Sequence, residues 1–240
     1  MIQNALAIFI CLLCCASART YAQNPPNETT TEPQTQPAAT AIDFSQLETL
    51  YETSFDSIED WEPSDDGWQQ KKIEDGNVLS LFKKKSNYKP KVRSPRHLTL
   101  LKEESFSDFR LDVQAYSTHK DYGHRDACFF FGYQSPTEFY YVHLGKVTDD
   151  ACNQIFIVNN AARKKISTTT SSGTQWDENW HNIRIERDTI SGEIRVYFDD
   201  MQTPVMTATD KTFSTGRIGL GSFDDTADFD NLKVAGPAEK

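Results

Sequence analysis

Short apolar or alternating runs repeat along the chain from about Tyr51 onward, and turn-forming residues (Gly, Asn, Asp, Ser and Pro) separate them. This pattern predicts about fourteen β-strands in roughly 190 residues, with no helical pattern of sufficient length between them. Because a parallel sheet needs helical crossovers, the pattern predicts one all-β domain, an antiparallel sandwich or barrel. The predicted strands are Val78–Phe82, His97–Leu101, Arg110–Ala115, Cys128–Tyr133, Phe139–Gly145, Gln154–Asn159, His181–Arg187, Gly192–Phe198, Val205–Thr209, Arg217–Phe223 and Phe229–Val234, with shorter ones near Phe55, Trp68–Lys72 and Ile166–Thr170.

Two neighbouring runs, Trp180–Arg187 and Gly192–Asp199, show the alternation most clearly. Their isoleucine and valine side chains fall on one face, which is predicted to be buried. The opposite face carries aromatic and charged side chains, namely Trp180, Arg184, Glu186, Glu193, Arg195 and Tyr197. Two interpretations of this polar face stay open: ordinary cross-strand charge pairs, or an aromatic and polar surface that binds sugars.

The same two runs resemble the concanavalin A-like jelly-roll superfamily, including laminin G-like domains, in which a Trp-His strand, a Gly turn and a Val-Tyr-x-Asp strand follow one another. Here the matching residues are Trp180-His181, Gly192 and Val196-Tyr197-Phe198-Asp199. The closing runs Gly216–Gly221 and Phe229–Val234 are similar to the last strands of these domains and of bacterial 3-keto-disaccharide hydrolase relatives. The resemblance covers roughly Tyr51 to Gly236.

This resemblance implies a two-sheet antiparallel jelly-roll sandwich and, as in exported bacterial proteins of this type, a lectin-like module that binds a poly- or oligosaccharide. The same fold carries several functions, so two alternatives stay open. One is a glycoside-cleaving enzyme resembling the 3-keto-disaccharide hydrolases, and the other is a protein-binding adhesion module of laminin G type.

Known catalytic signatures are missing from the sequence. Family 16 glycoside hydrolases of this fold place three carboxylates on one strand face as Glu-x-Asp-x-Glu. The nearest cluster here, Glu59-Asp60-Trp61-Glu62, has the wrong spacing and adjoins Pro63. There is no Gly-x-Ser-x-Gly, His-Glu-x-x-His or phosphate-loop motif. These absences favour binding over catalysis, although they leave room for an unfamiliar active site.

The N-terminal region is predicted to direct export. The apolar run Ala5–Ala18 has 14 residues, which is short of the ~20 that span a bilayer. Small residues before Ala18 and Ala22 offer cleavage sites, so residues 1–22 are predicted to be a signal peptide, with an uncleaved anchor as the alternative. The Pro/Thr/Gln-rich residues 23–43 are predicted to be a disordered linker before the sandwich (44–236) and a short tail (237–240). The mature protein is therefore expected to be secreted or periplasmic, without a membrane span.

The segment Phe44–Glu52 is expected to form a short helix, because Leu47, Leu50 and Tyr51 follow helical spacing.

Charge is distributed unevenly. The net charge is −10 and the pI is about 5.0, which argues against a dedicated nucleic-acid-binding protein, since such proteins normally carry net positive charge. The segment Lys83–Lys102 nevertheless contains eight Lys and Arg residues and no acidic residue. It is predicted either to be a solvated loop or to meet an acidic or sulfated polysaccharide.

A second candidate site lies on the hairpin of Cys128–Tyr133 and Phe139–Gly145, which the turn Ser135–Glu138 joins. Polar side chains at its open end have no core to fill, so they are expected to be accessible. Arg and Lys would bind hydroxyls or a carboxylate, His143 would act as a hydrogen-bonding or acid/base group, and Tyr141 would stack on a sugar. The alternative is a salt bridge of Arg125 with an Asp and a histidine satisfied by backbone. The predicted carbohydrate-binding residues are Arg96, His124, Arg125, Asp126, Tyr141, His143 and Lys146.

Cysteine and aspartate positions suggest two further features. After loss of the signal peptide, Cys128 and Cys152 remain, and the spacing leaves open whether they form a disulfide. Asp230 shares the face of Leu232 and Val234 and is expected to point inward. Relatives with this fold often hold a structural Ca²⁺ between their first and last strands, and Asp230 with Asp56 or Glu52 would supply oxygen ligands. The alternative is that Asp228 and Asp230 cap turns at an edge strand.

Overall fold

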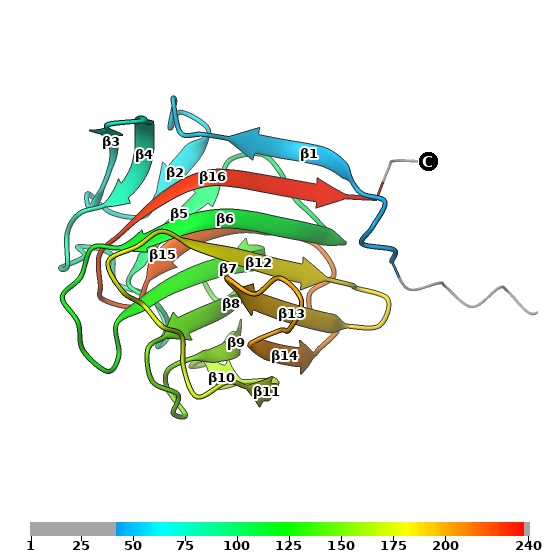
Figure 1. Cartoon of the computed structure of the whole chain (residues 1–240). Coiled ribbons are helices and arrows are strands. Elements are labelled where there is room, and N and C mark those ends of the chain that lie inside the picture. Colours follow the sequence, from blue (N-terminus) through cyan, green and yellow to red (C-terminus); the bar gives the residue numbers. More distant parts are fainter. Residues whose placement is uncertain (1–41, 238–240) are drawn as a thin grey trace, which may run out of the picture. The chain divides into compact units, whose positions relative to one another are not determined.

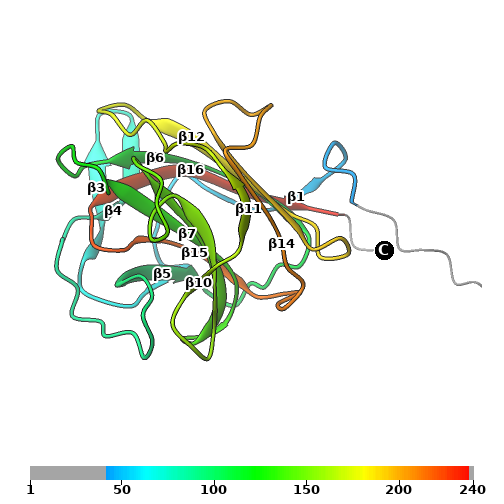
Figure 2. The same ribbon diagram turned by 90° about the horizontal axis from the view of Figure 1, so that it is seen from below.

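The computed structural model describes residues 42–237, which form two antiparallel β-sheets packed face to face (Figures 1 and 2). The all-β sandwich predicted from the sequence is confirmed. The described residues contain sixteen strands: β1 (Glu48–Thr53), β2 (Trp61–Pro63), β3 (Trp68–Ile73), β4 (Gly76–Leu81), β5 (His97–Leu101), β6 (Phe109–Ser117), β7 (Asp126–Ser135), β8 (Glu138–Gly145), β9 (Gln154–Asn159), β10 (Lys164–Lys165), β11 (Ser167–Thr170), β12 (His181–Arg187), β13 (Glu193–Phe198), β14 (Met206–Thr209), β15 (Arg217–Ser222) and β16 (Ala227–Gly236).

The strand order mixes distant parts of the sequence in both sheets. The nine-stranded sheet has the order β11-β14-β13-β12-β6-β16-β4-β3, and β1 pairs with β16 outside this path. The seven-stranded sheet has the order β10-β9-β8-β7-β15-β5-β2. In Figure 2 the layer of β12, β6 and β16 lies over the layer of β15 and β5. The late strands β15 and β16 therefore join strands that come much earlier in the chain.

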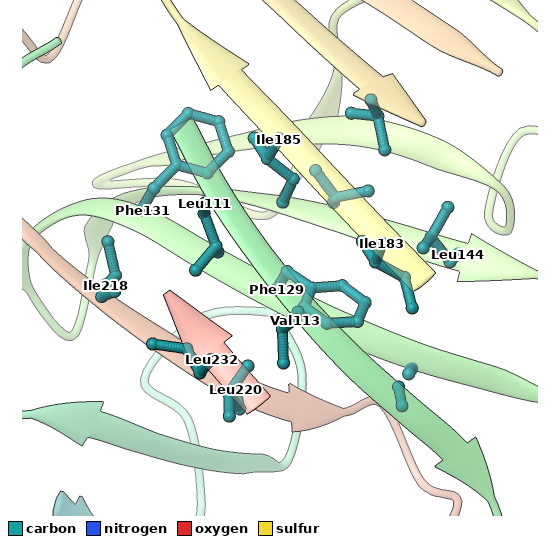
Figure 3. Packing of buried hydrophobic residues seen from close by; sticks show 14 of the residues in the cluster. Leu111, Val113, Phe129, Phe131, Leu144, Ile183, Ile185, Ile218, Leu220 and Leu232 are labelled. Carbon is teal, nitrogen blue, oxygen red and sulfur yellow. The ribbon is translucent and has the colours of Figure 1, made fainter. Parts of the chain in front are cut away.

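Alternating side chains build the main core between the two sheets. In β6, Leu111, Val113 and Ala115 are buried and the residues between them are half-buried on the outer side. Figure 3 shows how side chains of both sheets meet, with Phe129 and Phe131 of β7 near Ile183 and Ile185 of β12. Burial of each such side chain contributes about 1.5–3 kcal/mol. The face of the β12–β13 hairpin that the sequence predicts to be buried is part of this core.

The seven-stranded sheet is also buried on its outer side. A second apolar cluster lies there, and the connection between β4 and β5 (residues 82–96) covers part of it, with Val92 packed against it (the teal loop at the lower left of Figure 2). This cluster explains why β7 and β8 are almost continuously buried. Its members are Leu98, Leu100, Cys128, Phe130, Phe139, Tyr141, Phe156 and Val158.

Two expectations for the start of the domain were wrong. Residues 48–53 form strand β1 rather than part of a helix, because they pair with β16 from Glu48↔Gly236 to Thr53↔Leu232. Phe55 is not in a strand. Its φ is 58°, and its side chain is fully buried in the core. The predicted signal peptide, most of the linker and the last residues of the tail lie outside the described residues. Within residues 42–237 no helix is long and apolar enough to cross a membrane.

Candidate functional site

The predicted hairpin of β7 and β8 forms, with Asp126 paired to Gly145 and Ser135 to Glu138. Its side chains are far less accessible than expected. Tyr141 is 0% exposed, and Arg125, Asp126 and His143 are buried as well. The expectation failed because the sheet's outer side is covered, so polar groups at the strand ends are enclosed. Their role in binding stays a prediction.

Asp126, Tyr141 and His143 lie together beneath this cover. His143 Nε2 lies 2.6 Å from Asp126 Oδ2, and Nδ1 lies 3.0 Å from the carbonyl oxygen of Ala151. The guanidinium of Arg163 donates to the Tyr141 hydroxyl at 2.7 Å and stacks against the ring of Phe156. Burial raises the pKa of Tyr141 well above its ordinary value. The group is internally satisfied and offers little to an outside ligand.

The other four predicted carbohydrate-binding residues do not join the group of Asp126, Tyr141 and His143. Arg125 donates to Ser117 and to the carbonyl oxygens of Trp176 and Asp177, so it fastens β7 to β6 and to the loop before β12. The exposed His124 pairs with Asp149, and Lys146 pairs with Asp121. Arg96 lies over the ring of Phe223. The seven side chains do not converge into one pocket.

Cys128 and Cys152, the two cysteines within residues 42–237, are free and buried, with no disulfide between them. Burial raises the pKa of Cys152 to about 12 and that of Cys128 well above its ordinary value. Among residues 42–237, Asp126, Cys128 and His143 form the one group of three His, Cys, Asp or Glu with ligand atoms all within 4.8 Å. The charge of Arg163 opposes the effect of burial on the pKa of Cys128.

Asp56 and Asp230, the predicted calcium ligands, line one hollow of about 390 Å³. Burial and the charge of Asp56 raise the pKa of Asp230, while the backbone N–H of Asn231 opposes this rise. Asp75, Asn77 and Asn231 also line the hollow. Their carboxylate and amide oxygens are ligand types that Ca²⁺ prefers. The donor set fits this ion, and calcium binding stays a prediction.

This hollow belongs to a groove on the outer face of the nine-stranded sheet. A second hollow, also about 390 Å³, shares Ile73, Asp75 and Trp180 with the first. The Trp180 ring lies beside Tyr116 of β6, with ring centroids 5.6 Å apart. We call the two hollows together the Trp180 groove; its polar lining consists of Ser54, Asp56, Lys71, Glu74, Asp75, Asn77, Gln114, Asp228, Asp230 and Asn231.

Asp228 is the most unusual group in the Trp180 groove. Its neighbours Ala227 and Phe229 enter the core, so the strand alternation turns Asp228 to the outer side, yet its side chain is only 4% exposed. Oδ2 accepts a hydrogen bond from Lys71 Nζ at 2.7 Å. Oδ1 is buried and has no partner among the described residues. An unpaired buried oxygen costs about 1–3 kcal/mol, so this position is held at the expense of stability.

An irregularity in β16 places the next polar groups. The register with β6 shifts between Asp230 and Lys233, and Asn231 has a φ of 48°. Such bulges redirect side chains out of the normal alternation. Asn231 Nδ2 donates to Gln114 Oε1 at 2.8 Å, and Gln114 Nε2 donates to Asn182 Oδ1 at 3.2 Å. The three amides form a ladder across β16, β6 and β12 beside the groove.

The remaining half of this face is occupied by ion pairs. Glu186 accepts hydrogen bonds from Arg110, Arg195 and Tyr197, and Arg184 pairs with Asp112. The interpretation as cross-strand charge pairs therefore holds for this half of the face, and sugar binding by the other half stays a prediction. Cross-strand pairs account for the charged side chains, whereas Trp180 lines an open hollow.

Sequence reasoning missed most of the Trp180 groove. Alternation in β6 places Gln114 and Tyr116 on the polar face, but only the register His181↔Ala115 brings them beside Trp180. One of the two alternatives predicted from the sequence makes Asp228 a turn cap at an edge strand. It lies instead between Ser80 of β4 and Tyr116 of β6, inside the sheet.

Comparisons with known proteins agree with the fold. A family model described as the 3-keto-alpha-glucoside-1,2-lyase-like domain matches residues 51–235. Carbohydrate-binding module CBM66 from Bacillus subtilis is 18% identical, with a TM-score of 0.53 over 73% of this chain and 94% of that one. A protein of unknown function with a galectin-like fold, also from Bacillus subtilis, is 12% identical, with a TM-score of 0.50 over 80% of this chain and 100% of that one. No curated protein matches the chain.

Proposed function

The chain belongs to the 3-keto-alpha-glucoside-1,2-lyase-like domain family, and from this premise we propose that it is a glycan-binding module whose ligand lies in the Trp180 groove. The ligand class is a neutral glucoside-type oligo- or polysaccharide. Support comes from the family description and from the similarity of the fold to that of a carbohydrate-binding module. The geometry of the groove supplies the remaining argument.

The unpaired Oδ1 of Asp228 is the observation that carries the proposal. Oδ1 is buried at the floor of the hollow, so a sugar hydroxyl would donate to it once the carboxylate or the partly exposed Lys71 side chain turns aside. The bond would be charge-assisted and about twice as strong as a neutral one. Binding would thus recover the free energy that the unpaired Oδ1 costs.

An aromatic surface adjoins this acceptor. Trp180 and Tyr116 are half-buried, so each keeps part of its ring accessible. Aromatic rings stack on the apolar faces of sugars, while carboxylates and amides bind the hydroxyls around the ring edge. Asn77, Gln114 and Asn231 provide such amides in the adjoining hollow, which shares Trp180 with the hollow of Asp228.

The charge of the groove favours a neutral ligand. Five carboxylates line the two hollows (Asp56, Glu74, Asp75, Asp228 and Asp230), and Lys71 is the only cation among the lining residues. An acidic sugar would be repelled at this position. The acidic glycan predicted from the sequence therefore fits another part of the surface better.

A binding assay tests the proposal. Isothermal titration with neutral α- and β-linked gluco-oligosaccharides is expected to show binding by the parent protein. Trp180→Ala should weaken it about 2- to 10-fold, since aromatic stacking contributes about 0.5–1.5 kcal/mol. Asp228→Asn should weaken it about tenfold by removing the charged acceptor. Ile190→Ala alters an exposed apolar side chain in the β12–β13 turn and serves as the control.

The same variants distinguish the other two candidate functions. If the parent releases product from the glucosides or their 3-keto derivatives, and Asp228→Asn abolishes release, the module is an enzyme and Asp228 is its base. If no sugar binds but a protein ligand is retained, the adhesion alternative holds. Equal glucan affinity of parent, Trp180→Ala and Asp228→Asn would show that the ligand binds outside the Trp180 groove.

A further inference from the structure

The connection between β4 and β5 concentrates positive charge in an acidic protein. The chain carries a net charge of −10, and Lys83–Lys102 contributes +8 with no acidic residue. The rest of the chain therefore carries −18, because −10 minus +8 equals −18. Most of the segment's cations lie in residues 83–96, which we call the basic strap.

The backbone of the basic strap is held firmly against the sheet. The buried His97 contacts Asp65 and the carbonyl oxygen of Lys84, and Asp65 also accepts a hydrogen bond from Ser86. Ser94 and Pro95 are buried. At the other edge, the backbone N–H of Arg163 donates to the carbonyl oxygen of Arg93 at 3.0 Å. The strap is an anchored surface rather than a loosely attached loop.

Apart from Lys83, the cations of the strap are exposed and have no acidic partner in the part of the chain that the structure describes. Within residues 42–237, only Lys83 of the strap forms a salt bridge, with Asp66. Lys164 of β10, next to Arg163, is also exposed and makes no salt bridge. Like charges this close repel one another unless counter-charges gather between them. The exposed cations without a carboxylate partner are Lys84, Lys85, Lys89, Lys91, Arg93, Arg96 and Lys164.

The ring of Phe223, beside the strap, packs against two arginine side chains. The guanidinium groups of Arg163 and Arg96 lie 4.5 and 5.9 Å from its ring centroid. Arg163 already donates to Tyr141 and Ala151, whereas no hydrogen bond occupies the side chains of Arg96 and Arg93 within the described residues. A guanidinium fork presented in this way is suited to bidentate contact with a sulfate or carboxylate.

We propose that the basic strap is a second binding surface, for an anionic polysaccharide carrying sulfate or carboxylate groups. A flexible glycan can follow the cations of the strap without approaching the acidic remainder of the protein. A nucleic-acid duplex presents a wide, rigid array of phosphates, which that remainder would repel. This surface is separate from the Trp180 groove, so it does not depend on the function proposed for that groove.

The experiment measures affinity for three probes: a highly sulfated glycosaminoglycan, a polyuronate and double-stranded DNA. The strap variant carries Lys85→Gln, Lys89→Gln, Lys91→Gln and Arg93→Gln. The matched control removes four exposed cations with no salt bridge elsewhere on the domain, and thus changes net charge equally; it carries Lys72→Gln, Lys120→Gln, Lys211→Gln and Lys233→Gln.

The strap variant is expected to lose at least about tenfold in affinity for the sulfated or carboxylated glycan, and the control less than about twofold. The slope of log affinity against log salt should fall by ~3–4 in the strap variant, since each neutralised anionic contact contributes nearly one. Trp180→Ala should bind the anionic glycan like the parent. Equal losses in strap variant and control, no binding of either glycan, or tighter binding of DNA would overturn the proposal.

Discussion

Tyr141 illustrates what full enclosure does to a single side chain. Its ring stacks with Phe130 and Phe156 at centroid distances of 5.8 and 5.1 Å, and its hydroxyl accepts from Arg163. Tyr141→Ala is expected to lower the free energy of unfolding by about 3–5 kcal/mol, as for other large aromatic truncations. Tyr141→Phe should lower it by about 1–3 kcal/mol, because only the charged hydrogen bond is lost.

Urea unfolding of these two variants, with the half-buried Tyr116→Ala as control, checks this ranking. A Tyr141→Ala protein as stable as Tyr116→Ala would show that the cover over the seven-stranded sheet opens in solution. The side chain would then be available for the binding role that the sequence suggested.

Asp225 gives a residue-level prediction about pH. Burial, followed by the charge of Asp126, raises the pKa of Asp225 from 3.8 to about 6. Because the folded-state pKa exceeds the unfolded one, folding takes up a proton between these values. This carboxyl therefore lowers the free energy of unfolding as the pH rises from about 4 to about 6.

Asp225→Asn removes this titration while keeping one acceptor for Tyr122 or for the N–H of Asp126. The stability of the variant relative to the parent should increase across the same pH window and stay constant above it. Chemical denaturation of both proteins at several pH values measures the difference. A difference independent of pH would place the Asp225 pKa near its ordinary value.

At the scale of elements, the bulge in β16 yields a test of the calcium prediction. Asp230 has a raised pKa, so its ionised form is disfavoured in the folded protein without a cation. Asp230→Asn is then expected to raise the melting temperature in the presence of a chelator. If Ca²⁺ binds, added calcium should stabilise the parent by mass action and leave the variant unchanged.

Thermal unfolding with chelator and with added Ca²⁺ separates the cases. Leu50→Ala, in the neighbouring β1 and 45% exposed, is a control that removes no oxygen ligand. If calcium fails to raise the melting temperature of the parent, Asp56 and Asp230 line the same hollow without binding calcium, and the prediction is wrong.

Several elements could be predicted from short apolar or alternating runs, because neighbouring residues alone decide them. His97–Leu101, Gln154–Asn159 and His181–Arg187 were predicted with the bounds observed. By contrast, β1 has mostly exposed side chains and no alternation of its own, and only pairing with β16 makes it a strand. The Trp180 groove likewise depends on the register of β16, β6 and β12, which a single sequence does not contain.

For the whole molecule, we propose that the protein is exported after removal of residues 1–22. Of five cysteines, three (Cys11, Cys14 and Cys15) precede this point. The processed protein should therefore release two thiols on denaturation, and the intact chain five. Before denaturation Cys128 and Cys152 should react slowly, because burial raises their pKa values and excludes the reagent.

N-terminal sequencing of the protein recovered outside the cytoplasm, combined with a thiol count in denaturant, checks this prediction. Met1 at the N-terminus together with five reactive thiols would contradict processing. Substitution of Cys152 by Ser should reduce the count of the processed protein to one and serves as calibration.

The position of β16 in the nine-stranded sheet also has a consequence for biosynthesis. This strand pairs with β1, β4 and β6, yet it is the last of the sixteen to leave the ribosome. Until Ala227–Gly236 emerges, β4 and β6 lack the neighbour that joins them, so the sheet cannot close. Such non-local pairing makes folding slow, in the range of milliseconds to seconds or longer. A nascent chain kept open in this way remains suitable for threading through a translocation channel before it folds.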